Sequence, residues 1–321
     1  MATGTIWTKG GNAFGFGHLV RMKYLGKALK AKGIQVDYLC EGDSSAWEYL
    51  KTQNLSVFPI RKKSEIREKL AEVTPDLLII DKLELDSEDE DILRGSKAKK
   101  VLFDNQDYSV DLVDMKINAL VDLWKPDLDQ AINPLENLIL NPEIYRYRKD
   151  SIGEKIQHIF LAFGATDNRN YTTKFLQLFD KLEGDFKVHV NIGPGNQNLM
   201  EKTYDSKFIF YNNPSNLFEI MKSTDLALCG GGVMMMELMY IGVLVAPVAT
   251  EVHEQKNIDF FLKRKAVVNI GNIEQDSVTI SSIESLLNQK IKNSEIIKNA
   301  QYLIDGKGLE RIIQKIEGIL K

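Results

Sequence analysis

A glycine-rich turn with a histidine at its end is the first stretch of the sequence that could support chemistry. The segment "GGNAFGFGH" precedes a helical pattern and places Gly15, Gly17 and His18 together. Glycines let the backbone approach a ligand closely and adopt positive φ. A helix dipole disfavours a positive imidazole at the helix start and so favours the neutral form, a potential base. His18 is therefore a candidate catalytic base, and capping or packing in a tight turn is the equally weighted alternative.

A second glycine-rich segment, "CGGGVMMMEL", could bind phosphate. Gly230, Gly231 and Gly232 end an apolar run and open a helical pattern, an arrangement in which backbone N–H groups cradle anions. Glu237 follows about two turns into that helix and could accept hydrogen bonds from sugar hydroxyls. The alternative is a tight turn with a surface glutamate. Function is favoured, because three successive glycines are entropically costly.

Weaker signals lie between and after these segments. In "FGATD", Gly164, Thr166 and Asp167 read as the capped start of a helix, which can also bind an anion. A plain N-cap is the simpler interpretation of that stretch. In "TEVHEQKN", the polar residues His253, Glu254 and Gln255 follow another predicted strand, where a ligand site and a solvated helix start are equally plausible.

Three features that suggest metal or acid–base chemistry have simpler explanations. The acidic run at 85–93 is typical of a solvated helix face, and the Asp-x-Asp at 127–129 is a chance match in a loop. His158 and His189 fall in strand patterns and are expected to be structural. No cysteine–histidine spacing indicates zinc, so no metal and no cofactor are predicted.

Short apolar runs alternate with helical patterns along the whole chain, as in βαβ units with parallel sheets. The first set of strands is expected at 5–8, 34–40, 76–81 and 99–105, with helices at 18–33, 44–52 and 64–72. The second set is expected at 158–164, 186–193, 207–212, 225–232, 243–249 and 266–271. A polar segment separates the two sets, which predicts an N-terminal domain at 1–150 and a C-terminal domain at 151–321 that includes the terminal helices. The predicted fold is α/β, with two Rossmann-like doubly wound domains facing a ligand cleft.

Composition narrows the class of protein. The chain has 321 residues, a formal net charge of −4, 44% hydrophobic residues and two cysteines. This balance does not suggest a nucleic-acid partner, and the cysteines fit reduced, buried thiols. No apolar run approaches the roughly 20 residues of a membrane span, and no signal peptide is evident, so a cytoplasmic location is expected. A nicotinamide-dependent oxidoreductase is disfavoured, because the Gly-x-Gly-x-x-Gly fingerprint is absent.

The order of these segments, with "VRMKYLGKALKAKG", "LLIID", "LFDN" and a late "GGG…E…Q", resembles the PseG/SpsG family. That family is similar to GT-B glycosyltransferases such as MurG, which implies two Rossmann-like domains with the nucleotide held mainly by the second. Its best-known members hydrolyse UDP-2,4-diacetamido-2,4,6-trideoxy-β-L-altropyranose in pseudaminic acid biosynthesis. The SpsG branch is described as spore-coat polysaccharide glycosyltransferase-like.

The resemblance assigns roles to individual positions. His18 matches the catalytic histidine of the family. Two further candidates do not come from the resemblance: Asp81 at the end of "LLIID" as a second catalytic residue, and Arg21 as a substrate contact. Lys82 and Leu83 stand where the hydrolases carry His-Tyr, with the tyrosine implicated in activity. The positions assigned to the nucleotide-binding half are Gly164, Thr166, Asp167, Gly230, Gly231, Gly232, Glu237 and Gln255.

The resulting hypothesis is a metal-independent enzyme that cleaves the anomeric C–O bond of a UDP-sugar and releases UDP, as a PseG-like hydrolase in surface-glycan or nonulosonic acid biosynthesis. One alternative is an inverting GT-B glycosyltransferase that uses a sugar or glycan acceptor. The other is a nucleotide-sugar binding protein without turnover, which the missing tyrosine motif would explain.

Overall fold

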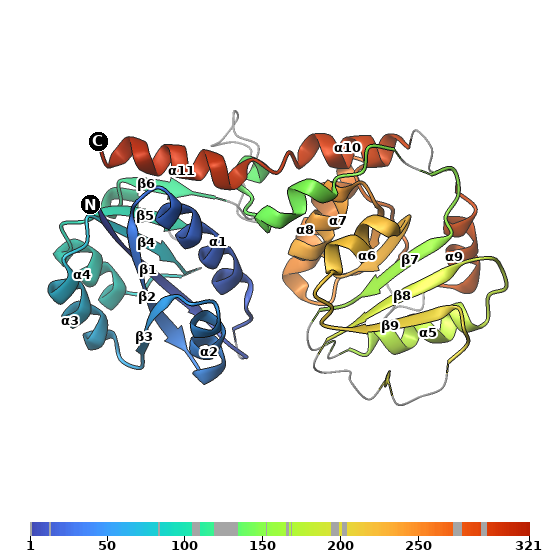
Figure 1. Ribbon diagram of the computed structural model, residues 1–321, viewed down its shortest axis with the longest axis horizontal. Helices are drawn as coiled ribbons and strands as arrows, with labels where there is room; N and C mark the ends of the chain where they lie inside the picture. The colour runs from blue at the N-terminus through green and yellow to red at the C-terminus, as the bar shows by residue number, and fades with distance from the viewer. Residues whose placement is uncertain are drawn as a thin grey trace. The chain divides into compact units, whose positions relative to one another are not determined.

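The computed structural model describes residues 2–12, 14–82, 84–104, 110–118, 134–151, 153–164, 167, 169–193, 199–200, 204–271, 278–289 and 294–321. The chain divides into two compact units (Figure 1). Unit 1 comprises Met1–Pro142 with Gly306–Lys321, and unit 2 comprises Glu143–Asp305.

Unit 1 is built on a six-stranded parallel sheet in the order β3-β2-β1-β4-β5-β6. Its strands are β1 Thr3–Gly10, β2 Gln35–Gly42, β3 Ser56–Ile60, β4 Leu77–Asp81, β5 Lys99–Phe103 and β6 Met115–Ile117. Its helices are α1 Gly17–Ala31, α2 Ser44–Thr52, α3 Lys63–Val73, α4 Ser87–Gly95 and α11 Gly308–Ile319. Short 3₁₀ turns follow at Val110–Leu112, at Pro134–Asn137 and, across the unit boundary, at Pro142–Tyr147.

Helices cover both faces of this sheet. Helix α1 buries Leu19, Met22, Leu25 and Leu29, a stripe at helical spacing, in a core that also holds residues of α2 and α11. Helices α3 and α4 pack on the opposite face. All five residues of β4 are buried, as expected for a central strand that is covered on both sides.

Unit 2 is built on a five-stranded parallel sheet in the order β11-β10-β7-β8-β9. Its strands are β7 His158–Ala162, β8 Lys187–Ile192, β9 Phe208–Asn212, β10 Leu226–Cys229 and β11 Leu244–Pro247. Its helices are α5 Tyr171–Asp180, α6 Leu217–Ser223, α7 Val233–Ile241, α8 Val252–Lys263, α9 Ile280–Leu287 and α10 Glu295–Leu303. Helices α5 and α9 share one apolar core with the sheet, and α7 packs against β10 and β11.

The two parallel sheets confirm the predicted fold class of two doubly wound, Rossmann-like domains. In each unit the strand order reverses beside the first strand of that unit, between β1 and β4 and between β7 and β10. Ligands of doubly wound sheets bind at the carboxyl ends of the strands next to such a reversal. In unit 1, His18 follows β1 and Asp81 is the last residue of β4; in unit 2, the segment at 230–232 follows β10.

Some elements differ from the sequence-based expectation. The predicted strand at 266–271 is wrong, since this segment makes one hydrogen bond to β11, from Val268 N–H to the Val245 carbonyl at 2.8 Å, and pairs no further. Strands β3 and β6 were not expected. The assignment of both terminal helices to the second domain also needs correction, because α11 buries Leu309, Ile312 and Ile316 in the core of unit 1. In the described residues, no helix combines the length and apolarity that a membrane span requires.

Candidate active site

A closed turn positions His18 at the start of α1. The Gly11 N–H donates to the Gly15 carbonyl at 3.1 Å, and the Phe14 N–H donates to the Gly11 carbonyl at 3.1 Å. Gly15 adopts a φ of +78°, which explains the glycine at this position. Gly17 is the first residue of α1, and a Cβ added there would meet open space, so its backbone does not require glycine.

His18 forms a close pair with Asp81, the last residue of β4. The distance from His18 Nδ1 to Asp81 Oδ1 is 2.7 Å, and the Asp81 side chain is fully buried while that of His18 is 20% exposed. Because a carboxylate with a low pKa carries no proton, the shared hydrogen belongs to Nδ1. The neutral ring then has its lone pair on Nε2, which makes His18 chemically competent as a base.

Arg21, one helical turn after His18, completes the cluster. Its Nε donates to Asp81 Oδ2 at 2.8 Å, and its two terminal nitrogens donate to Asp81 and to Asp104. Both aspartates are fully buried, and the Arg21 side chain is 12% exposed. Arg21 therefore holds the Asp81 carboxylate with a forked contact, and its other terminal nitrogen pairs with the second carboxylate, Asp104. Its guanidinium faces this chain's own carboxylates, which makes it a structural partner of Asp81, and a substrate contact of Arg21 stays a prediction.

Electrostatics keep this cluster charged. Burial disfavours the Asp81 carboxylate, but Arg21 and then His18 outweigh that cost and lower its pKa from 3.8 to about 2. Burial likewise opposes the charge on Arg21, and Asp81 and Asp104 raise its pKa above the ordinary value. Asp81 therefore remains ionised at every physiological pH and keeps His18 in one tautomer.

The lowered pKa of Asp81 predicts how stability depends on pH. Since the folded state binds this proton more weakly than the unfolded chain, the contribution of Asp81 is fully present above its ordinary pKa of 3.8 and is lost as pH falls through about 2. We expect the difference in unfolding free energy between the wild type and Asp81→Asn to shrink as the pH falls from 7 to 3. Urea titrations across that range test this expectation, and a difference that does not change with pH would contradict it.

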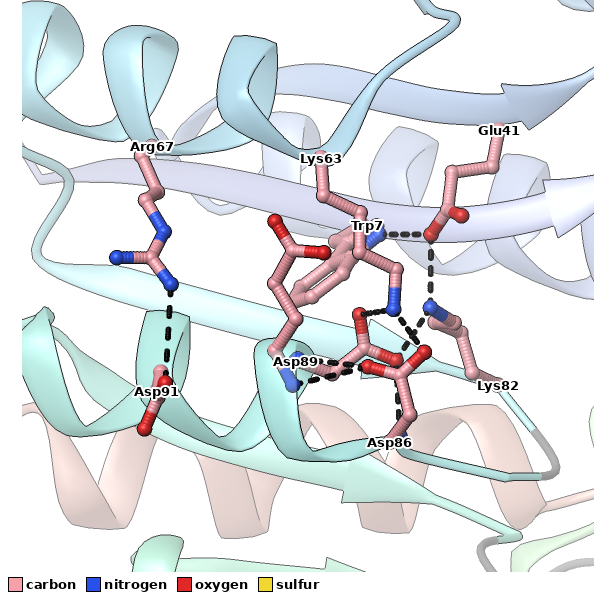
Figure 2. Close-up of polar contacts among 9 residues, drawn as sticks. Trp7, Glu41, Lys63, Arg67, Lys82, Asp86, Asp89 and Asp91 are labelled. Carbon is pink, nitrogen blue, oxygen red and sulfur yellow. Dashed lines mark hydrogen bonds and ion pairs between the residues drawn. The ribbon is translucent and has the colours of Figure 1, made fainter.

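Lys82 belongs to a separate polar cluster on the α3/α4 face of the sheet (Figure 2). Lys82 directly follows the last residue of β4, and its contacts with Glu41 and Asp89 place its side chain on the face opposite to that of Asp81. Its ammonium is 2.8 Å from Glu41 Oε1 and 2.8 Å from Asp89 Oδ2, and the side chain is 7% exposed. Lys63 pairs with the other oxygen of Asp89 at 2.7 Å. Lys82 is thus bound in a buried ion-pair network.

The acidic run at 85–93 is only in part a solvated helix face. Asp86 caps α4 through the N–H groups of Glu88 and Asp89 and also pairs with Lys63. Asp89 is 1% exposed, which corrects the expectation for that residue: its side chain faces Lys63 and Lys82 on the inner side of α4. Among the described residues, no group of three or more metal-binding side chains is arranged to hold an ion.

The glycine turn of unit 2, Gly230–Gly232, connects β10 to α7 and packs against the start of α8. A Cβ at Gly231 would lie 2.8 Å from the Glu254 carbonyl oxygen, and one at Gly232 would lie 3.2 Å from Glu254 Oε1. Asn257 donates to the Gly231 carbonyl at 3.0 Å. The close approach of α8 is therefore a structural reason for glycine at 231, in addition to any ligand.

The N–H groups of the glycine turn are candidates for anion binding. Within the described part of the chain, the backbone N–H groups of Gly230, Gly231 and Gly232 donate to no other group. Glu254 was one of the polar residues expected near a ligand, but its Oε2 accepts from Thr250 N and Oγ1 at 2.7 and 2.8 Å and so caps α8. The structure thus places a buried carboxylate beside the predicted phosphate site.

The remaining predicted nucleotide contacts have different local surroundings. Both carboxylate oxygens of Asp167 accept backbone N–H groups in the first turn of α5, from Tyr171 and Thr172 at 2.9 Å each, while the N-cap position itself is Asn170. Gln255 is exposed and donates to Asp259 at 2.8 Å. Glu237 is half-buried in α7, Gly164 has a φ of +81°, and Thr166 lies outside the described residues.

Sequence reasoning did not identify Asp104, Glu41 or Asn257. Asp104 follows β5 in the quoted "LFDN" segment, and Glu41 is the penultimate residue of β2, so both stand near carboxyl ends of strands, which is a usable signal. Asn257 gave no signal, because its contact with the Gly231 carbonyl joins residues that are 26 positions apart.

Comparisons with known proteins place the fold. No family model matches the chain. Solved structures that resemble it include Acinetobacter baumannii MurG (TM-score 0.70, 13% identity, 98% of this chain and 99% of that one) and the calicheamicin glycosyltransferase CalG4 (TM-score 0.72, 11% identity, 100% and 98%). The spinosyn rhamnosyltransferase SpnG in complex with thymidine diphosphate has a TM-score of 0.63 at 12% identity, over 99% and 100%. The fold is therefore of the GT-B type.

Two relatives are similar in sequence. The spore coat polysaccharide biosynthesis protein SpsG of Bacillus subtilis is 23% identical over 327 residues, which cover 96% of this chain and 95% of SpsG. The uncharacterized protein MJ1062 of Methanocaldococcus jannaschii is 24% identical over 291 residues, which cover 84% of this chain. The matched region spans 60% of MJ1062.

Proposed function

We propose that this protein processes a nucleotide-sugar: it cleaves the anomeric C–O bond of a UDP-sugar and releases UDP. The observation that carries the proposal is the His18–Asp81 pair at the reversal of strand order in a GT-B fold. Asp81 fixes the tautomer of His18, and Nε2 accepts the proton of the attacking oxygen. The similarity to SpsG, whose name refers to polysaccharide biosynthesis, supports the same substrate class.

The nucleotide is assigned to unit 2. The diphosphate binds the N–H groups of the glycine turn and the N-terminus of α7, which stabilise the negative charge that develops on the leaving group. The N–H groups and the N-terminus of α7 supply a positive field that is proposed to outweigh the nearby Glu254 carboxylate, so the reaction is proposed to be metal-independent. Glu237 is proposed to accept hydrogen bonds from sugar hydroxyls, with Gly164, Thr166 and Gln255 as further contacts.

Water is the proposed attacker, as in a PseG-like hydrolase of nonulosonic acid or surface-glycan biosynthesis. An acceptor hydroxyl is the second candidate, which would make the protein an inverting glycosyltransferase. A specific observation favours that candidate: the position that carries His in the hydrolases is Lys82, whose ammonium is bound by Glu41 and Asp89. A binding protein without turnover is the third candidate, and UDP release distinguishes it from both.

The phosphate assignment predicts the effect of a charge in the glycine turn. Gly232→Asp should weaken UDP binding by about 100-fold or more, because a carboxylate facing a diphosphate costs several kcal/mol. Gly232 suits this test, since its added Cβ would meet only the end of the Glu254 side chain, at 3.2 Å. Calorimetry with UDP measures the affinity.

Gly232→Ala is the matched control, and we expect it to keep UDP affinity within a few-fold of the wild type. Gly231→Asp should also abolish binding, but its Cβ would lie 2.8 Å from the Glu254 carbonyl oxygen and would disturb the packing of α8. Unchanged UDP affinity in folded Gly232→Asp would refute the assignment of the diphosphate to this turn.

A further inference from the structure

A carboxylate on the α3/α4 face of unit 1, Glu41, is fixed by two neighbours that hold the same oxygen. The indole N–H of Trp7 donates to Glu41 Oε1 at 2.6 Å, and the Lys82 ammonium lies 2.8 Å from the same atom. Trp7 is fully buried, and the Lys82 ammonium also lies 4.7 Å from the centroid of its ring. Figure 2 shows both contacts converging on one oxygen of Glu41. The carboxylate is therefore oriented by groups that are themselves held in place.

The second oxygen of Glu41 is available to a ligand. Within the described residues Oε2 has no hydrogen-bond or ion-pair partner, and the side chain is 17% exposed. Behind it, Lys82 is tied to Asp89, and Asp89 is tied to Lys63, so the support extends to α3 and α4 (Figure 2). A preorganised, partly dehydrated acceptor of this kind binds a hydroxyl or amide N–H more strongly than a mobile surface carboxylate does.

The register places Glu41 at the same sheet edge as the proposed catalytic pair. Thr8 of β1 is level with Asp81 of β4, and the next residue, Lys9, is level with Glu41 of β2. The carboxyl ends of three adjacent strands thus bring the two carboxylates to one edge, Asp81 on the α1 face and Glu41 on the opposite face. At this edge the Lys9 ammonium lies 3.9 Å from the centroid of the Phe14 ring, and Phe14 is 54% exposed.

We infer that Glu41 is a substrate-binding residue that accepts a hydrogen bond from a hydroxyl or amide N–H of the sugar, with Lys82 and Trp7 as its positioning residues. This inference rests on the proposed function and adds the residue in unit 1 that recognises the sugar. It also explains why a lysine occupies position 82: the ammonium serves to orient Glu41, and no proton transfer is assigned to it.

The test uses Glu41→Gln and Lys82→Met in the full chain, with UDP-sugars of a defined panel as donors and UDP alone as the probe of nucleotide binding. Glu41→Gln should lower kcat/KM for the sugar donor by about 10- to 100-fold, the range for a hydrogen bond to a charged group. Its affinity for UDP should stay within about two-fold, since UDP lacks the sugar. Lys82→Met should also lower kcat/KM, through a higher KM. The double variant should be little worse than Glu41→Gln alone, because both changes remove the same interaction. Lys82→Arg should restore part of the loss.

Asp37→Asn is the matched control, because Asp37 lies on the same strand near its amino end, away from the sheet edge. It should leave kcat/KM unchanged. The indole N–H resonance of Trp7, assigned with Trp7→Phe, reports whether the local structure is intact in each variant. If Glu41→Gln does not fold, Lys82→Met alone decides the question.

A normal kcat/KM in folded Glu41→Gln would overturn the inference, and so would a normal kcat/KM in Lys82→Met if only that variant folds. The proposed function would still stand in that case, provided that the wild type releases UDP. An equal loss of UDP affinity and of kcat/KM would also overturn it, since that pattern indicates a structural role. If the wild type releases no UDP from any donor, the proposed function fails and the inference fails with it.

Discussion

Replacement of His18 by alanine should lower turnover of the nucleotide-sugar by about 10²- to 10⁴-fold, the usual contribution of a general base. The pair with Asp81 at 2.7 Å leaves Nε2 as the only basic nitrogen of the ring, and alanine removes it. Affinity for UDP should remain within a few-fold, because the nucleotide is assigned to unit 2. Initial rates of UDP release, with calorimetric titration of UDP, separate the two quantities.

Two further variants sharpen this prediction. His18→Asn keeps a polar side chain near Asp81 but has no basic nitrogen, so it should be impaired to a similar degree. His158→Ala is the matched control: His158 is an exposed histidine at the start of β7 whose Nδ1 lies 3.0 Å from His189 Nε2. Near-normal turnover in both His18→Ala and His158→Ala would contradict the catalytic role. His18 would then be a packing residue of the glycine-rich turn.

Replacement of Arg21 by methionine should destabilise unit 1 by about 3–5 kcal/mol, the cost of leaving buried charges without their partner. Arg21 links Asp81 and Asp104, both fully buried, and methionine keeps most of the side-chain length without the charge. Tryptophan fluorescence during urea unfolding measures the effect in this unit, because all three tryptophans, at positions 7, 47 and 124, lie in its sequence.

Two further variants serve as controls for Arg21→Met: the same substitution at an exposed arginine, and the added removal of one of the buried charges. Arg67→Met removes an exposed arginine that lies 4.0 Å from Asp91, and this change should cost no more than about 1 kcal/mol. Adding Asp104→Asn to Arg21→Met should recover part of the lost stability, since one of the two buried charges is then removed. A loss below about 1 kcal/mol for Arg21→Met would mean that the buried carboxylates do not depend on this guanidinium.

The fold could be predicted where the sequence pattern is local. Apolar runs such as "LLIID" and the helical stripe that begins at Leu19 are explicit in the sequence, and they give β4 and α1. Strand β3 was not predicted, because "SVFPI" carries a proline, which sheets accept only at an edge. The place of α11 could not be predicted, because its apolar face would fit either unit and the choice depends on contacts with α1, distant in the sequence.

The candidate site was predictable in its parts but not in its connections. His18 and Arg21 are one helical turn apart, and Asp81 ends a strand, so each was identifiable as a candidate. The sequence could not show that Arg21 would bind both Asp81 and Asp104. Asp104 lies 83 positions after Arg21. Nor could it show that Asp167 would turn both oxygens onto the backbone of α5, since a cap and a ligand contact look alike in sequence.

The most direct test of the proposed function is UDP release from a panel of UDP-sugars, measured with and without candidate sugar acceptors and with chemical analysis of the sugar product. We expect at least one donor to release UDP in the absence of a divalent metal, with loss of that release in His18→Ala. A free sugar as product identifies water as the attacker, and a glycoside identifies an acceptor. Tight UDP binding with no release from any donor, with or without acceptors, would contradict the proposed function and indicate a nucleotide-sugar binding protein.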